Sequence, residues 1–437
     1  MSETRIQKQA RRRRRRAVAG IAIALAMAFA GAHAFIAGLP LAPAGVCAWL
    51  SGVVLWPDVA RRSRVQAVAL MIVGVAGLAW GVYCGVRLPW GRALAGNAAL
   101  LGMLAAVGFL RLIAAPADEP GETLPAGRRG VVGTLVGLHA FGAVVNLSTV
   151  FIMAHRMASA GHIDDQQLRV LTRGFASAAF WSPFFAAMAA ALTYAPGARL
   201  ERVIAVGLPV ALLALAITAV ELARERLDDF RGYPLHAGSL WLPAVLAAVI
   251  LILHGLAPDL SVLGIITVLA PALTALILPF REARPAALLS RQVTARLPLM
   301  ANELTLFLAA GVMAAGLESV VATLGGWVPF SGFGGWQAGL VLACMVLLAL
   351  VGVHPLIGIA AFGTLLAPLD PDPSLLAMTF LAGWAIGVAV SPLSGLNLAL
   401  QGAYDIAPRR IIVANARYGA VMVAVTTVAL VLYANWL

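Results

Sequence analysis

Long apolar stretches recur along the whole chain, separated by short polar segments that hold most of the charged residues. A helix needs roughly 20 apolar residues to cross the hydrocarbon core of a bilayer, and more than ten of the stretches approach that length. The pattern predicts an all-α integral membrane protein. The apolar stretches are 17–38, 41–56, 65–84, 93–113, 130–153, 175–195, 200–222, 239–257, 260–280, 298–323, 336–368, 374–401 and 411–436.

Two of these stretches do not resemble single spans. The stretch 336–368 is too long for one crossing and carries Gly352, Pro355 and Gly358 near its middle. The stretch 130–153 has glycines on both sides of His139, so it could form two half-length arms instead of one span. Glycine and proline interrupt helices, so both stretches are predicted to be re-entrant helical hairpins.

The distribution of positive charge favours one topology. If 130–153 enters from the cytoplasm and 336–368 from outside, every other stretch crosses once, which gives about 11 transmembrane helices. The cytoplasmic segments then hold 26 of the 31 Lys and Arg residues, including the block Arg11 to Arg16. A second arrangement, in which the two hairpins are spans and 175–195 and 374–401 are re-entrant, places 154–174 with its three arginines outside.

The preferred topology places the chain in a bacterial inner membrane, with its N-terminus in the cytoplasm. The net charge of +12 is then explained by topology and by attraction to anionic lipid headgroups, without a nucleic-acid partner.

The same topology divides the chain into two halves of opposite orientation. After a basic cytoplasmic tail (1–16) and an extra first span (17–38), we predict a first inverted repeat over 39–222 and a second over 239–437. In each repeat a hairpin precedes a proline-containing helix, at 175–195 and at 374–401. Inverted repeats of this kind are common in secondary transporters.

The two proline-containing helices share a short sequence pattern. Segment 176–192 reads ASAAFWSPFFAAMAAAL and segment 385–400 reads AIGVAVSPLSGLNLAL, so each places Ser-Pro in the middle of the membrane. Proline removes one backbone hydrogen bond, and a broken helix is tolerated in hydrocarbon where it is buried or lines a cavity. Free N–H groups at such a break attract anions, and free carbonyls can hold Na⁺. An ordinary proline kink remains the alternative.

We therefore expect the substrate and ion site at the hairpin tips and the helix breaks. The candidate residues are His139, Gly142, Asn146, Ser148, Thr149, Ser182, Pro183, His354, Pro355, Gly358, Ser391, Pro392, Ser394 and Asn397.

Four ionisable residues inside apolar stretches are candidates for ion coupling: His139, His354, Glu303 and Glu318. For each, a structural role is the alternative. The three cysteines are far apart and show no metal-binding spacing. Motifs of serine hydrolases, zinc proteases and P-loop enzymes are absent from the sequence, so we expect neither an enzyme nor a cofactor, beyond Na⁺ as a candidate coupling ion.

This layout, with a hairpin and a Ser-Pro break in each half, resembles the ion transporter superfamily, which includes divalent-anion/sodium symporters. The resemblance implies that substrate and ions bind between hairpin tips and broken helices, and that a transport domain moves like an elevator against a scaffold. It also implies a homodimer. The Ser-Asn-Thr triplets of dicarboxylate symporters are absent, and Asn146-Leu147-Ser148-Thr149 is only a loose echo of them.

The sequence thus favours a secondary transporter for a small anion or organic acid, coupled to Na⁺ or H⁺. Two other classes stay open. One is a flippase or membrane enzyme for lipid-linked or envelope substrates. The other is a membrane subunit that works with a partner such as a periplasmic binding protein.

Overall fold

The computed structural model describes residues 3–114, 124–145, 147–158, 161–233, 241–257, 259–325 and 329–436. Within these ranges every regular element is helical, apart from one isolated antiparallel bridge between Ala126 and Arg231. Eight helical segments of the described chain are long and apolar enough to cross a membrane, and three shorter apolar helices accompany them. The predicted all-α membrane architecture is confirmed, whereas the number of about 11 spans stays a prediction.

The helices form two compact units, each built from two separate parts of the chain. Unit 1 comprises Met1–Ile113 and Ile250–Trp327, and unit 2 comprises Ala114–Val249 and Val328–Leu437. Each half of the chain therefore gives its earlier helices to unit 1 and its later helices to unit 2. The division between the units at Val249 and Ile250 falls within helix α11 (Trp241–Leu256).

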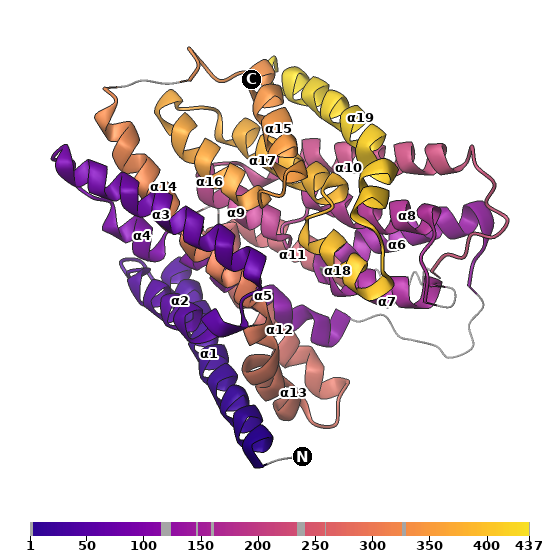
Figure 1. The fold of residues 1–437 in the computed structure, drawn as a ribbon, viewed down its shortest axis with the longest axis horizontal. Helices are drawn as coiled ribbons and strands as arrows, with labels where there is room; N and C mark the ends of the chain where they lie inside the picture. The colour runs from indigo at the N-terminus through magenta and orange to yellow at the C-terminus, as the bar shows by residue number, and fades with distance from the viewer. Residues whose placement is uncertain are drawn as a thin grey trace. The chain divides into compact units, whose positions relative to one another are not determined.

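Unit 1 is centred on the packing of α3 against α14, which run side by side in Figure 1. A Cβ atom added to Gly74 of α3 would lie 2.5 Å from the carbonyl oxygen of Val312, and one added to Gly316 would lie 2.2 Å from that of Gly74. Small residues at such positions let two membrane helices approach closely. The helices of unit 1 are α1 (Glu3–Phe35), α2 (Ala42–Leu55), α3 (Arg61–Tyr83), α4 (Trp90–Ala95), α5 (Ala98–Ala114), α12 (Val262–Ile277), α13 (Pro285–Arg291) and α14 (Ala301–Thr323).

The basic block near the N-terminus belongs to α1 and does not form a separate tail. Arg12 and Arg16 both donate hydrogen bonds to the carboxylate of Asp58, at 3.1 and 2.9 Å, and Arg15 forms an ion pair with it at 2.9 Å. Burial raises the pKa of Asp58, but the hydrogen bond and charge of Arg16, with those of Arg15, outweigh burial and hold it below its ordinary value. The basic run is helical because an acidic partner and the following apolar span both hold it in place.

Unit 2 holds both predicted hairpins and both proline-containing helices. Its most buried helix is α17, which contacts α15, α19, α9 and α8 (Figure 1). The helices are α6 (Gly127–Val145), α7 (Ser148–Met157), α8 (Asp165–Ser177), α9 (Ala186–Tyr194), α10 (Leu200–Leu222), α15 (Gly335–Leu350), α16 (Pro355–Leu366), α17 (Pro373–Val390), α18 (Gly395–Tyr404) and α19 (Pro408–Ala434).

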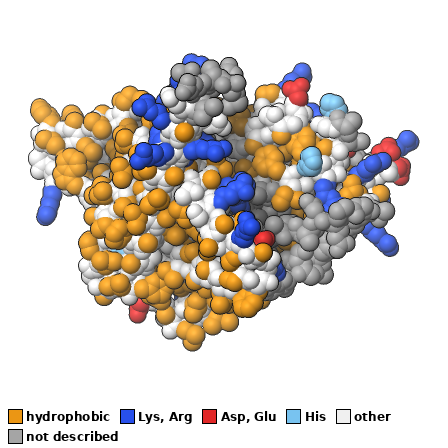
Figure 2. All heavy atoms as spheres, turned by 90° about the horizontal axis from the view of Figure 1, so that it is seen from below, with side chains coloured by type: hydrophobic (Ala, Val, Ile, Leu, Met, Phe, Trp, Pro, Cys, Tyr) orange, Lys and Arg blue, Asp and Glu red, His pale blue; other side chains and the backbone are white. Residues whose placement is uncertain are grey.

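Large hydrophobic side chains cover much of the face shown in Figure 2, as a lipid-facing surface requires. Among the described residues, large hydrophobic side chains that are more than half exposed include Val53, Ile72, Leu256, Phe280 and Leu347. A soluble protein rarely exposes apolar side chains over such an area. This surface and the eight long apolar helices together describe a multi-pass membrane protein.

Candidate functional site

Each half of unit 2 consists of a helical hairpin followed by a broken helix. In the first half the hairpin is α6 and α7, and the following helix stops at the 3₁₀ turn η2 (Ala178–Phe180) before α9 begins at Ala186. In the second half the hairpin is α15 and α16, and α17 ends at Val390 before α18 begins at Gly395. Both interruptions contain a Ser-Pro pair.

The two Ser-Pro serines make the same set of hydrogen bonds. Ser182 Oγ donates to the carbonyl of Ala143 at 2.5 Å, and Ser391 Oγ donates to the carbonyl of Ala349 at 2.5 Å. Each hydroxyl also accepts from the backbone N–H two residues later, at 3.2 Å. The two alanines lie at the C-terminal ends of α6 and α15, where helix carbonyls lack intrahelical donors. Each break thus caps the first arm of its own hairpin.

The second break carries further polar groups that the first one lacks. Asn397 Nδ2 donates to the carbonyls of Val388, Ala389 and Ser391, at 3.1, 3.3 and 2.9 Å, so it satisfies carbonyls that the interruption of the helix sets free. Ser394 caps α18 by accepting from the N–H of Asn397 at 3.2 Å.

Two candidate residues keep an unused acceptor. The Oδ1 of Asn397 and the Oγ1 of Thr149 are buried and have no hydrogen-bond partner among the described residues. A buried polar atom without a partner costs free energy, so such an atom points to a ligand, an ion or a water. Oxygen atoms of this kind suit a hard cation such as Na⁺. The described residues contain no group of three His, Cys, Asp or Glu side chains that could hold a metal.

Both ring nitrogens of His139 have hydrogen-bond partners in the first half of unit 2. Its Nδ1 lies 2.8 Å from Ser177 Oγ, and Trp181 Nε1–H donates to its Nε2 at 3.0 Å. Tryptophan only donates, so Nε2 is the acceptor and the proton of the neutral ring resides on Nδ1. Protonation of His139 would therefore require the loss of the Trp181 hydrogen bond.

His354 and Pro355 begin the second arm of the second hairpin. His354 Nδ1 accepts from the N–H of Leu356 at 3.2 Å, and the ring meets Trp384 edge-on at 5.3 Å. Pro355 occupies the first turn of α16, where its missing N–H costs nothing. Gly358 allows close packing, because an added Cβ would lie 3.3 Å from Met345 Cγ.

Some of the remaining candidate residues pack against neighbouring helices or lie in the unwound segments. The others lie outside the residues that the structure describes. Gly142 of α6 faces Phe175, whose Cδ2 would lie 3.0 Å from an added Cβ. Pro183 and Pro392 occupy the unwound segments, and the carbonyl of Pro392 accepts from Gln401 Nε2 at 2.5 Å. Asn146 lies outside the described residues, and so does the side chain of Ser148.

Glu303 and Glu318 belong to unit 1, not to the unit that holds the hairpins and breaks. Glu318 forms an ion pair with Arg92 at 2.6 Å. Glu303 lies in the first turn of α14 with an exposed side chain.

The two halves of unit 2 contact one another through their broken helices. The second arm α16 packs on α9, where an added Cβ on Gly363 would lie 2.8 Å from Tyr194 Cβ, and α17 contacts η2 and α9. The hairpin of one half thus supports the broken helix of the other.

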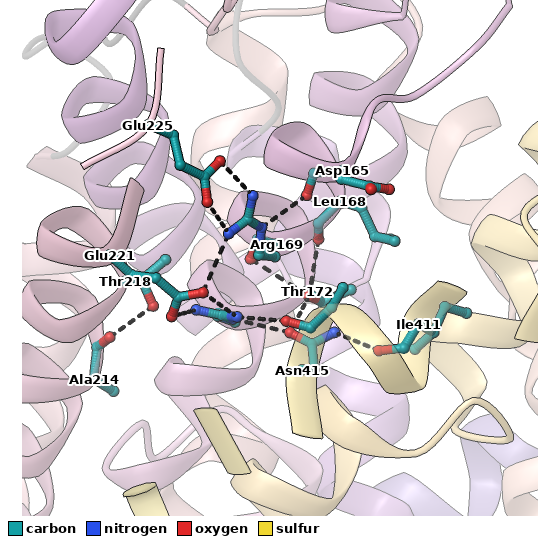
Figure 3. Close-up of polar contacts among 12 residues, drawn as sticks. Asp165, Leu168, Arg169, Thr172, Ala214, Thr218, Glu221, Glu225, Ile411 and Asn415 are labelled. Atoms are coloured by element: carbon teal, nitrogen blue, oxygen red, sulfur yellow. Dashed lines mark hydrogen bonds and ion pairs between the residues drawn. The ribbon is translucent and has the colours of Figure 1, made fainter. Parts of the chain in front are cut away.

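A buried charge network joins three helices of unit 2, as Figure 3 shows. Arg173 of α8 is 1% exposed and donates to Glu221 at 2.8 Å, to Asn415 at 2.9 Å and to the carbonyl of Ala414 at 2.6 Å. The segment 154–174 lies between two predicted apolar stretches, but it is helical from Asp165 onward, because α8 begins there with a capping box formed by Asp164 and Gln167. That Asp-x-x-Gln spacing is a sequence signal that could have located the helix start.

No protein-family model and no curated protein matches the chain. Among solved structures, the crystal structure of the Alcanivorax borkumensis YdaH transporter, described as having an unusual topology, is similar at 15% identity. The similarity covers 85% of this chain and 86% of that one, with a TM-score of 0.43. That score is too low for the similarity to carry a conclusion about function.

Proposed function

We propose that this chain is a secondary active transporter that moves a small anion or organic acid across the inner membrane, coupled to Na⁺ or H⁺. The observation that carries the proposal is the duplicated break. Ser182 and Ser391 each donate a hydrogen bond to a carbonyl at the end of the first arm of the preceding hairpin, and both lie in unit 2. Paired broken helices inside a membrane unit are the usual frame of a substrate site in secondary transporters.

The polar groups of the second break support an ion or substrate site in unit 2. Asn397 is fully buried, its amide nitrogen stabilises three freed carbonyls, and its Oδ1 keeps an unused acceptor. A coupling cation or a donor group of the substrate would satisfy that oxygen. Thr149 of the first hairpin offers a second oxygen of the same kind.

The way in which each half of the chain is divided between the two units supports an elevator mechanism. Both hairpins and both breaks belong to unit 2, whereas unit 1 is built from the earlier helices of each half. Unit 2 is the transport domain in this proposal and unit 1 is the scaffold. A homodimer held through unit 1 completes it.

Uptake into proteoliposomes tests the proposal. Purified protein is reconstituted, and radiolabelled succinate, citrate and sulfate are offered under an inward Na⁺ gradient, under an inward proton gradient and without either. We expect at least one of the three probes to accumulate under one gradient only. Uptake that ignores both gradients contradicts ion coupling, and absence of uptake for all three probes contradicts the proposed substrate class.

The same liposomes separate the proposal from its main rival. A fluorescent phospholipid in the inner leaflet reports lipid translocation by its accessibility to an external quencher. A lipid flippase would expose this lipid without an ion gradient, whereas the proposed transporter leaves its distribution unchanged.

A further inference from the structure

A cavity of about 630 Å³, lined mostly by charged residues, opens beside the charge network of unit 2. It lies between α8, the end of α10 and the first three turns of α19. Four arginines and two carboxylates line it, which gives the lining a formal charge of 4 − 2 = +2. The charged lining residues are Asp165, Arg169, Glu221, Arg409, Arg410 and Arg417.

Two of the arginines are already neutralised by partners. Arg410 forms an ion pair with Asp165 and also donates to the carbonyl of Ile163 at 2.8 Å. Arg169 is 11% exposed and forms ion pairs with Glu221 at 3.1 Å and with Glu225 at 2.7 Å (Figure 3). These pairs fix the wall of the cavity.

The other two arginines supply the excess charge. Arg409 and Arg417 are exposed on α19, and neither has a side-chain partner within the described part of the chain. They lie eight residues apart, about 80° apart around the helix, and Val413 lies between them. Val413 and Ala414 also line the cavity, and their side of it is its floor. The hollow is therefore open to a ligand with several acceptor oxygens.

The floor of the cavity is rigid because of the residues beneath it. Arg173 lies under the floor, donates to the carbonyl of Ala414 and faces the ring of Tyr418 at 4.5 Å. The position of α19 is thus fixed relative to α8 and α10 before any ligand arrives. Guanidinium groups bind planar or tetrahedral oxyanions well, because they offer charge-assisted and often bidentate hydrogen bonds.

We propose that this cavity binds a phosphate group between Arg409 and Arg417. A phosphate monoester carries a charge of about −1.5 to −2 at neutral pH and the phosphodiester of a phospholipid headgroup about −1, so the excess positive charge of the lining attracts either. The positive-inside topology places the cavity on the cytoplasmic side, where two sources meet it: the headgroups of anionic phospholipids and soluble phosphate compounds. The site is separate from the hairpin tips and breaks, so it stands independently of the transport proposal.

Thermal unfolding of the full chain in two arms tests the site and identifies its source. In the first arm, protein in neutral detergent is titrated with inorganic phosphate against sodium chloride at equal ionic strength. In the second, nanodiscs of phosphatidylcholine alone are compared with nanodiscs that also contain phosphatidylglycerol. The variant is Arg409→Gln with Arg417→Gln. The matched control is Arg224→Gln with Arg226→Gln, which removes two exposed arginines of the same unit outside the cavity.

We expect phosphate or phosphatidylglycerol to raise the Tm of the wild type and of the control pair. In the cavity pair, the concentration needed should rise by about tenfold or more, because each charge-assisted hydrogen bond is worth about that factor. A response to phosphate in detergent identifies a soluble ligand, and a response to phosphatidylglycerol alone identifies the lipid headgroup. Equal responses of the cavity pair and the control pair overturn the proposal, as does a wild type that responds to neither.

Discussion

The buried pair of Arg173 and Glu221 gives the sharpest test of how unit 2 is held together. Glu221 accepts from Arg173 at 2.8 and 3.3 Å, and the Arg173 side chain is 1% exposed. In Glu221→Gln the guanidinium charge stays buried and faces only neutral groups, among them the introduced amide oxygen and the oxygens of Asn415 and Ala414. Removal of one partner of a buried pair costs about 3–5 kcal/mol, and the partial exposure of Glu221 places the expected loss near the lower end.

The matched variant is Glu225→Gln, four residues further along and beyond the C-terminal end of α10. Glu225 also pairs with an arginine, at 2.7 Å, but its side chain is 37% exposed. An exposed pair contributes about 0–1 kcal/mol, because water solvates both charges and screens them. Two carboxylates four residues apart should thus differ several-fold in their effect on stability.

Tryptophan fluorescence during heating at one scan rate measures the difference. With roughly 2 °C per kcal/mol for a long chain, Glu221→Gln should lower the Tm by about 6 °C, and Glu225→Gln by less than about 2 °C. Adding Arg173→Met to Glu221→Gln should recover part of the loss, because no buried charge then remains. Equal Tm values for the two single variants would refute the assignment of Arg173 as a buried charge that depends on Glu221.

Three further outcomes are expected from the same measurement. Thr149→Val should raise the Tm, since removing a buried hydroxyl without a partner is worth about 1 kcal/mol, yet it should reduce transport if that oxygen contacts a ligand. Thr134→Val is its control in the same hairpin and should lower the Tm, because Thr134 Oγ1 donates to Gly130 at 2.6 Å and accepts from Tyr233 N–H at 2.7 Å. Ser391→Ala should cost about 2 kcal/mol through its two lost hydrogen bonds, against a negligible change for the exposed Ser290→Ala. The hydrogen bond from Arg169 lowers the pKa of Glu225 below its ordinary value of 4.5. The stabilisation from the Glu225 carboxylate is therefore fully present above pH 4.5 and is lost as the pH falls through the lower folded value. The Tm difference between wild type and Glu225→Gln should shrink as the pH is lowered below 4.5, and a difference that grows there contradicts this sign.

The helix breaks were predictable from the sequence because their cause is local. Proline lacks an N–H group wherever it stands, so Pro183 and Pro392 signal an interruption without any knowledge of the fold. The same holds for the over-long stretch around Pro355. Local chemistry therefore suffices for the two breaks. It did not locate the interruption of the first hairpin, because α6 runs unbroken through Gly137, His139 and Gly142 to Val145.

The charge network was not predictable, because its partners are distant in sequence. Arg173 looks like an ordinary loop charge until Glu221 and Asn415, 48 and 242 residues away, are brought against it by folding. The contacts of Trp181 with His139 and of Trp384 with His354 could not be predicted for a related reason. Trp384 meets His354 only through the packing of α17 on the second hairpin.

The two halves of unit 2 differ in the polarity of their breaks, and this difference bears on where a ligand binds. Aligning Ser182 with Ser391 places Phe185 and Met188 opposite Ser394 and Asn397, so the first break is apolar where the second is polar. Both breaks cap a hairpin in the same way, so capping cannot explain the extra polar residues of the second break. The buried amide of Asn397 does stabilise freed carbonyls, but a hydrophobic residue serves the first break at the equivalent position. The unused Oδ1 of Asn397 is therefore the feature of the second break that capping leaves unexplained, and we propose that the polar end of the site lies there.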